Sequence, residues 1–170
     1  MATPGIRHAV LWVSDPEVSA AFYEEALGLE IKERVGLGIF LSSPDSATDH
    51  DLGLFPSQAQ SPGEPGETAG DARSPGLYHI AWEVETLAEL VQAKDRLSGM
   101  DALVGENNHG VSRSLYCHDP DGIEFEIMWE LPLALYDSAD PSNVPLDLDA
   151  DIARWGDSTP GRGGNSDRTT

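Results

Sequence analysis

Cysteine and basic side chains are both scarce in this sequence of 170 residues. Cys117 is the single cysteine, which excludes an intramolecular disulfide and fits a reducing compartment. Lysine and arginine number 10 against 30 aspartates and glutamates, which gives a net charge of −20. A chain this acidic repels phosphate backbones and anionic lipid surfaces. We therefore expect no nucleic-acid or membrane partner, and most of the acidity should be solvated surface.

Long apolar runs are missing as well. No stretch reaches the roughly 20 consecutive apolar residues that a membrane-spanning helix needs. Met1 to Arg7 contain no basic region followed by an apolar one, so no signal peptide is expected. These absences predict a cytoplasmic protein. The length suits one compact domain, or two small half-domains that share a core.

Hydrophobic patterning divides the chain into two similar halves. The first half predicts a strand, a helix and three short strands, at 6–13, 17–27, 30–35, 38–42 and 51–55. The second half repeats this order, at 78–84, about 87–98, 101–105, 112–117 and 123–130. The predicted fold class is α+β, with two βαβββ modules that form a mixed β-sheet and helices outside it.

Changes in composition set the expected boundaries. The first module should span 1–56, a loop or linker rich in proline and glycine 57–76, and the second module 77–132. Residues 133–170 form a flexible, acidic C-terminal extension, expected to be partly disordered because 137–170 carry seven aspartates and no strand pattern. Four apolar residues within it predict one amphipathic turn or short helix: Leu146, Leu148, Ile152 and Trp155.

Three residues stand where a duplicated β-rich chain would bring strands together around one metal ion: His8, His79 and Glu126. His8 opens the β-prone run 8–13 and His79 the run 79–84, and each histidine lies 20 residues before the glycine that ends the next helix. Two imidazoles and one carboxylate leave coordination positions open, as oxygen-activating iron(II) enzymes require, and manganese(II) accepts the same ligands. The alternatives are strand-start histidines bound to backbone and a Glu126 that faces solvent, although a carboxylate between apolar strand residues is costly without a partner.

Several stretches resemble the vicinal oxygen chelate superfamily, which includes glyoxalases, bleomycin-resistance proteins and type I extradiol dioxygenases. They are 7–13 with 22–23 and 27–29, then 78–84, and 119–126 with its Asp-Pro-Asp-Gly turn. The resemblance implies a cup-shaped sheet built by the two modules. It also implies a metal inside the cup, held by His8, His79 and Glu126, and a protein that forms homo-oligomers.

Two further segments resemble extradiol dioxygenases within that superfamily. Residues 109–116 are similar to part of their last module, and residues 49–55 to the segment with their acid–base histidine. The resemblance implies that iron(II) binds a catechol-type diol and O2 together. It further implies that His50 exchanges protons, while Tyr116 and His109 hydrogen-bond the reacting oxygens.

Other interpretations remain open. A glyoxalase, epimerase or thiol transferase of this fold would use a metal without redox chemistry, and His50 would then be a fourth ligand. A drug-binding resistance protein usually lacks a complete metal triad, so the three ligands count against it. Tyr116 is equally interpreted as a core tyrosine, His109 as a turn residue and His118 as structural or solvent-facing. Cys117 is interpreted as a strand residue and not a nucleophile.

Overall fold

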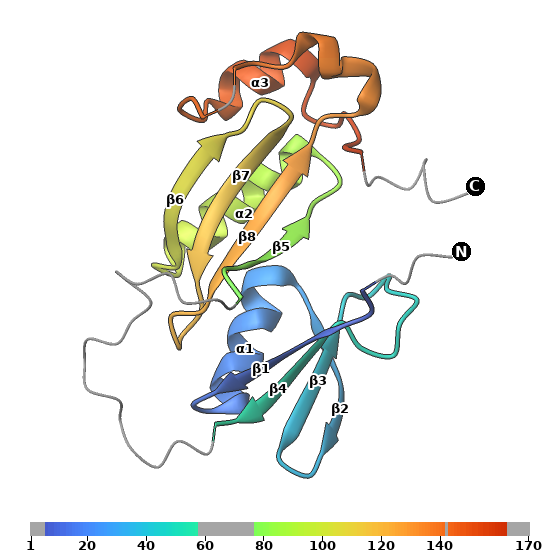
Figure 1. The fold of residues 1–170 in the computed structure, drawn as a ribbon, viewed down its shortest axis with the longest axis vertical. Helices are drawn as coiled ribbons and strands as arrows, with labels where there is room; N and C mark the ends of the chain where they lie inside the picture. The colour runs from blue at the N-terminus through green and yellow to red at the C-terminus, as the bar shows by residue number, and fades with distance from the viewer. Residues whose placement is uncertain (1–5, 58–76, 142, 163–170) are drawn as a thin grey trace. The chain divides into compact units, whose positions relative to one another are not determined.

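The computed structural model describes residues 6–57, 77–141 and 143–162. It separates into two compact units, Met1–Leu77 and Tyr78–Thr170. Each unit contains one βαβββ module, in which a helix covers one face of a four-stranded mixed sheet (Figure 1). The predicted α+β class with two such modules is confirmed. The predicted linker falls almost entirely on residues outside the described ranges.

The first unit has a sheet in which β4 is central. Its elements are β1 (Ala9–Val13), α1 (Pro16–Leu27), β2 (Glu30–Val35), β3 (Gly38–Ser42) and β4 (Leu52–Pro56). β4 pairs in parallel with β1 and antiparallel with β3, which gives the order β1-β4-β3-β2. α1 begins where the Asp15 side chain accepts a hydrogen bond from the backbone of Glu17, and it ends at Gly28 with φ 68°.

The second unit repeats this topology. Its elements are β5 (Ile80–Glu83), α2 (Leu87–Gly99), β6 (Leu103–Asn108), β7 (Ser112–His118) and β8 (Glu124–Glu130), with the order β5-β8-β7-β6. Thr86 and Glu89 form a capping box that starts α2. Leu87, Leu90 and Leu97 are fully buried, because the apolar side of α2 packs on the sheet.

Element boundaries differ from the sequence prediction at a few positions. β1 and β5 begin one residue after His8 and His79, so these histidines precede their strands instead of opening them. β6 begins at Leu103, later than the predicted 101. The reason is local: Asp101 has φ 53°, and the next backbone N–H, of Ala102, donates to the carbonyl of Leu97 at the end of α2.

The described part of the C-terminal extension is structured. It contains η1 (Leu133–Ser138) and α3 (Leu148–Trp155), and α3 corresponds to the short helix expected from its apolar residues. Composition predicted little structure here. Order arises because two of the aspartates, Asp140 and Asp151, bind a buried arginine, Arg113. Among the described residues, no helix is both long and apolar enough to cross a lipid bilayer.

Candidate active site

The second sheet has one face packed against α2 and one face that carries polar side chains. Phe125, Ile127 and Trp129 of β8 are buried on the α2 side. Because side chains alternate across a strand, Glu126 points to the opposite face. Tyr116 of β7 is the direct cross-strand partner of Glu126. The strand register therefore puts a phenol and a carboxylate side by side.

His79 and Glu126 form the central pair of this face. His79 lies just before β5, and the pairing of Ala81 with Glu126 brings it to the same side. The Nε2 atom of His79 lies 3.1 Å from Oε2 of Glu126, whose side chain is 9% exposed. Two atoms that bind one ion at about 2.1 Å and at right angles are separated by about 3 Å. The pair therefore fits two neighbouring ligands of a divalent cation.

A second carboxylate stands behind the His79 ring. Nδ1 of His79 lies 3.4 Å from Oε1 of Glu124. Both atoms are buried, and neither has a hydrogen-bond partner among the described residues. A carboxylate behind a metal-binding histidine fixes the tautomer that leaves the other nitrogen free for the ion. His118, by contrast, is 46% exposed, and its Nε2 lies 3.9 Å from Oε2 of Glu124.

A phenol–imidazole pair adjoins the carboxylates on this face. His109 lies in the turn between β6 and β7, and its Nε2 is 2.7 Å from the hydroxyl of Tyr116. The rings of Tyr116 and His79 meet edge-on, with centroids 5.9 Å apart. Burial, assisted by the negative charge of Glu126, raises the pKa of Tyr116. The phenol therefore keeps its proton near neutral pH and can donate a hydrogen bond.

His8 and His50 are brought together in the first unit. Their ring centroids lie 4.5 Å apart, and the Phe40 ring packs edge-on against His50 at 4.8 Å. Nδ1 of His50 lies 3.2 Å from a carboxylate oxygen of the exposed Asp49. With these neighbours the His50 side chain is 17% exposed.

A cluster around Asp51 organises the loop that carries His50. Its carboxylate accepts hydrogen bonds from four groups: the hydroxyls of Ser42, Ser46 and Thr48 and the backbone N–H of Ser43. Partial burial opposes ionisation of Asp51, but these hydrogen bonds outweigh it and lower the pKa of Asp51. The Asp51 carbonyl also accepts the backbone N–H of Ala9 at 2.9 Å, which fixes the residue after His8. Sequence reasoning missed this cluster, although the serines and threonine around an aspartate were a visible signal.

The three predicted metal ligands are divided between the units. His8 belongs to the first unit, and His79 and Glu126 belong to the second. Within residues 6–57, 77–141 and 143–162, no group of three histidine, cysteine, aspartate or glutamate side chains is arranged to hold a metal ion. Each unit thus presents a pair, His8 with His50 and His79 with Glu126. The assignment of His8, His79 and Glu126 as one ligand set stays a prediction.

The sheet face of the first unit that points away from α1 is aromatic. Trp12 and Phe55 are register partners and pack edge-on, and Phe55 packs in turn on Phe40. Trp12 is 67% exposed. A side chain at Gly38 would collide with the Phe55 ring, because a Cβ there would lie 2.6 Å from it. The glycine therefore permits the position of Phe55, a residue that sequence analysis did not single out.

Two residues on the α2 side of β7 take no part in the polar face. Burial raises the pKa of the Cys117 thiol to about 12. The thiol therefore stays protonated, which agrees with its interpretation as a strand residue. Arg113 is also fully buried, and sequence analysis missed it. The available signal was a charged residue in alternation with the apolar Leu115 and Cys117.

Comparisons with known proteins agree with this architecture. Comparison with curated protein sequences gives no significant match. Among solved structures, a glyoxylase/bleomycin resistance protein/dioxygenase domain from Frankia sp. EAN1pec is similar, with a TM-score of 0.62, 21% identity, and 81% of this chain and 99% of that chain covered. A lactoylglutathione lyase from Agrobacterium tumefaciens has a TM-score of 0.55 and 22% identity, with coverage of 75% and 95%.

A third similar structure contains a metal. It is a variant of the fosfomycin resistance protein FosX from Listeria monocytogenes, in complex with Mn(II) and 1S,2S-dihydroxypropylphosphonic acid. Its TM-score is 0.54 at 19% identity, and 74% of this chain and 90% of that chain are covered. The sequence model of one family matches residues 5–127, which is most of the chain. The chain therefore belongs to the Glyoxalase/Bleomycin resistance protein/Dioxygenase superfamily.

Proposed function

We propose that this protein is an iron(II)-dependent extradiol dioxygenase, which uses O2 to open the ring of a catechol-type aromatic diol. One observation carries the proposal. The His79–Glu126 pair, at 3.1 Å, shares its sheet face with the Tyr116–His109 pair, at 2.7 Å. The first pair suits a divalent cation, and the second offers hydrogen bonds to oxygens beside that cation. Together the two pairs would hold a metal-chelating diol by its oxygens.

The proposed metal ligands are His8, His79 and Glu126, as the family resemblance implies. Two histidines and one carboxylate leave positions open for other ligands. Iron(II), when bound, would supply a template for the diol and O2 and a path for electrons between them. Manganese(II) is the alternative ion for the same ligands. Glu124, whose Oε1 lies 3.4 Å from Nδ1 of His79, would fix the tautomer of His79 if a small rotation brought the two atoms into hydrogen-bond geometry.

The remaining roles fall on groups that handle protons. Tyr116, held as a phenol, would donate a hydrogen bond to an oxygen of the substrate. His109 would fix the direction of that phenol through the 2.7 Å contact. His50 would take a proton from the diol and return it to the product, since imidazole exchanges protons near neutral pH. Its neighbour Asp49, 3.2 Å away, would orient the ring.

A second candidate function is a metal-dependent enzyme without redox chemistry, such as a glyoxalase, epimerase or thiol transferase. The contact that favours it is the close approach of the His8 and His50 rings, whose centroids lie 4.5 Å apart. Two imidazoles this close would let His50 act as a fourth ligand beside His8. The similar structures include a lyase and a Mn(II)-bound fosfomycin resistance protein, and these support a metal-dependent enzyme without redox chemistry as the second candidate. That reaction would leave the Tyr116–His109 pair without a role.

The partners that we propose follow from the same resemblance. The substrate would be a small aromatic diol together with O2. The protein would act as a homo-oligomer in the cytoplasm, with no nucleic-acid or membrane partner.

Metal content and oxygen consumption separate the two candidates. The protein would be purified without oxygen, loaded with iron(II), and analysed for bound metal. Catechol and 2,3-dihydroxybiphenyl would then be added in air. The dioxygenase proposal expects oxygen uptake and a yellow ring-opened product, both lost in His8→Ala and Glu126→Ala. His118→Gln is the matched control, because His118 lies beside Glu124 but is exposed. Bound zinc or nickel with no oxygen uptake after iron loading would favour the second candidate.

A further inference from the structure

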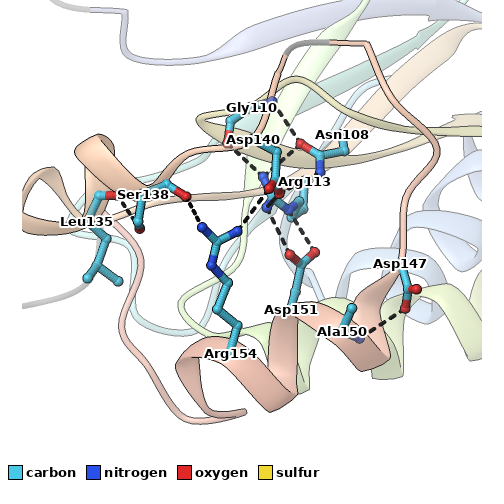
Figure 2. A network of polar contacts seen from close by, with 10 residues as sticks. All are labelled: Asn108, Gly110, Arg113, Leu135, Ser138, Asp140, Asp147, Ala150, Asp151 and Arg154. Carbon is cyan, nitrogen blue, oxygen red and sulfur yellow. Dashed lines mark hydrogen bonds and ion pairs between the residues drawn. The ribbon is translucent and has the colours of Figure 1, made fainter.

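Arg113 of β7 is a buried cation whose hydrogen bonds are all satisfied. Its side chain is 0% exposed. It makes five hydrogen bonds of 2.7–2.8 Å, one for each of its N–H groups. Figure 2 shows the guanidinium at the centre of this network, between a turn of the sheet and the C-terminal extension. A buried arginine is costly unless it is paired in this way.

One side of the guanidinium holds the turn between β6 and β7. Nη1 of Arg113 donates to the side-chain oxygen of Asn108 at 2.8 Å and to the carbonyl of Gly110 at 2.7 Å. The same Asn108 oxygen accepts the backbone N–H of Gly110 at 2.8 Å. Between these two residues lies His109, which contacts Tyr116. Arg113 thus binds the turn on both sides of His109.

The other side of the guanidinium is held by the C-terminal extension. Asp151 of α3 accepts two parallel hydrogen bonds, at 2.7 and 2.8 Å, in the bidentate geometry that arginine favours. Asp140 accepts from Nη2 of Arg113 at 2.8 Å and from the Asn108 amide at 3.1 Å. The backbone of Val144 also exchanges hydrogen bonds with that of Asn108. α3 lies across the end of the sheet at which β6 and β7 join (Figure 1).

We propose that the C-terminal extension contributes to the candidate site: Asp151 binds Arg113, and together they position His109 against Tyr116. The superfamily match ends at residue 127, so the extension lies beyond it. Arg113 and Asp151 touch no reacting group and act through the turn alone. The consequence for catalysis rests on the proposed function, whereas the positioning itself does not.

Geometry explains why the restraint of the β6–β7 turn by Arg113 and Asp151 matters. The His109–Tyr116 hydrogen bond is 2.7 Å long and depends on a turn that contains Gly110, with φ 85°. A glycine turn of this kind adopts many conformations when nothing restrains it. A displacement of about 1 Å in a catalytic group lowers a rate by up to about 100-fold. Arg113 adds two hydrogen bonds to the turn, and the bidentate pairing with Asp151 fixes the guanidinium that donates them.

The direct test observes the His109 ring in the full-length, metal-free protein. Nitrogen-15 NMR of the imidazoles reports which tautomer is present, and His109→Gln assigns the signals. The wild type should show one fixed tautomer for His109. In Asp151→Asn the His109 shifts should move toward the average of the two neutral tautomers. Arg162→Gln is the matched control, because Arg162 binds Glu130 and Tyr136 and leaves the turn untouched.

The NMR result differs if Arg113 and Asp151 stabilise the fold without positioning His109. If Asp151→Asn folds, as judged by circular dichroism, and keeps the wild-type His109 shifts, the proposal is wrong. If Asp151→Asn does not fold, Arg113→Lys decides, because lysine keeps the buried positive charge but lacks the planar guanidinium that binds Asp151 and the turn together. Its His109 shifts should move in the same direction, and unchanged shifts would again overturn the proposal.

Kinetics adds a second readout where the proposed dioxygenase activity is present. Asp151→Asn should lower kcat by about 10- to 100-fold, as His109→Gln does, with little change in KM or in bound iron. The double variant should be no slower than His109→Gln, since both changes disable one group. Independent, additive losses would contradict the proposal. If the wild type consumes no oxygen, the proposed function fails, and the NMR result still decides the positioning.

Discussion

The two sheets share one topology but present different open faces. In the first unit this face carries Trp12, Phe40 and Phe55, and Trp12 is largely exposed. In the second unit the equivalent face carries Glu126 and Tyr116, and Glu126 is nearly buried. Identical strand orders therefore support a face rich in aromatic rings, with His50 packed on Phe40, in one unit and a carboxylate beside a phenol in the other. The duplication fixes where side chains point, and the residue types decide the chemistry of each face.

The corresponding turns differ in the same way. The turn between β2 and β3 contains Gly36, with φ 61°, and Leu37, which is 77% exposed. The turn between β6 and β7 contains His109 and is bound from behind by Arg113. Only the second module is followed by a described extension that supplies Asp140 and Asp151. An added segment can thus convert a plain hairpin turn into part of a candidate site.

The largest effect should follow from removing the buried cation. Arg113→Met leaves Asp151 buried without a counter-ion, and it should lower the free energy of unfolding by about 3–5 kcal/mol. Urea unfolding followed by circular dichroism measures this change. Arg34→Met in the first unit is the comparison, because Arg34 forms an exposed pair with Glu17 and should have little effect. Equal losses in the two variants would contradict the difference between the units.

Removal of the Tyr116 hydroxyl should affect chemistry and leave the fold intact. Tyr116→Phe should lower the rate of oxygen uptake by roughly 100-fold, because a donor to the reacting oxygens is lost. Bound iron should stay at the wild-type level, since Tyr116 is not a proposed ligand. The control is Tyr136→Phe, whose hydroxyl binds Glu130, four residues along β8 from Glu126. A Tyr116→Phe variant with unchanged kcat would remove Tyr116 from the mechanism.

The Asp51 cluster should stabilise the first unit in a pH-dependent manner. Asp51→Asn should lower the free energy of unfolding by about 1–2 kcal/mol at pH 7, through weaker hydrogen bonds to Ser42, Ser46 and Thr48. The pKa of Asp51 is lowered in the folded state. Its contribution is therefore complete above the unfolded pKa of about 3.9 and is lost as the pH falls through the folded value. Urea unfolding at a series of pH values tests this, and an Asp51→Asn protein with the wild-type pH profile below about pH 4 would contradict it.

The smallest effect is expected on the aromatic face. Trp12→Ser should change the free energy of unfolding by no more than about 0.5 kcal/mol, because Trp12 is 67% exposed. Phe125→Ser, on the buried side of the second sheet, is the comparison and should be strongly destabilising. A decrease of about 2 kcal/mol or more in the free energy of unfolding of Trp12→Ser would contradict this expectation and show that Trp12 is buried in solution.

Sequence patterns predicted the modules well because their signals are local. Helical spacing between Glu17 and Leu27, and alternation from Glu124 to Trp129, depend on neighbours along the chain. Boundaries were less predictable, since the start of β6 depends on the left-handed conformation of Asp101. The position of Glu126 on the face opposite Phe125 is a local property of the same kind, since it follows from alternation along β8.

The site was only partly predictable from sequence. The family resemblance named His109 and Tyr116 together, and they lie in contact. The Arg113 network escaped notice because its partner Asp151 is 38 residues away and no periodicity joins them. Composition alone made the aspartates of the extension look solvated. Only tertiary structure shows that Asp140 and Asp151 neutralise a buried cation.

Oxygen stoichiometry with the iron-loaded protein tests the central claim most directly. An oxygen electrode and an absorbance trace would follow 2,3-dihydroxybiphenyl in the wild type and in Glu126→Ala. The proposed function expects one molecule of O2 consumed for each diol that gives yellow product, and no consumption by Glu126→Ala. Stoichiometric iron in the wild type without oxygen uptake or ring opening would contradict it.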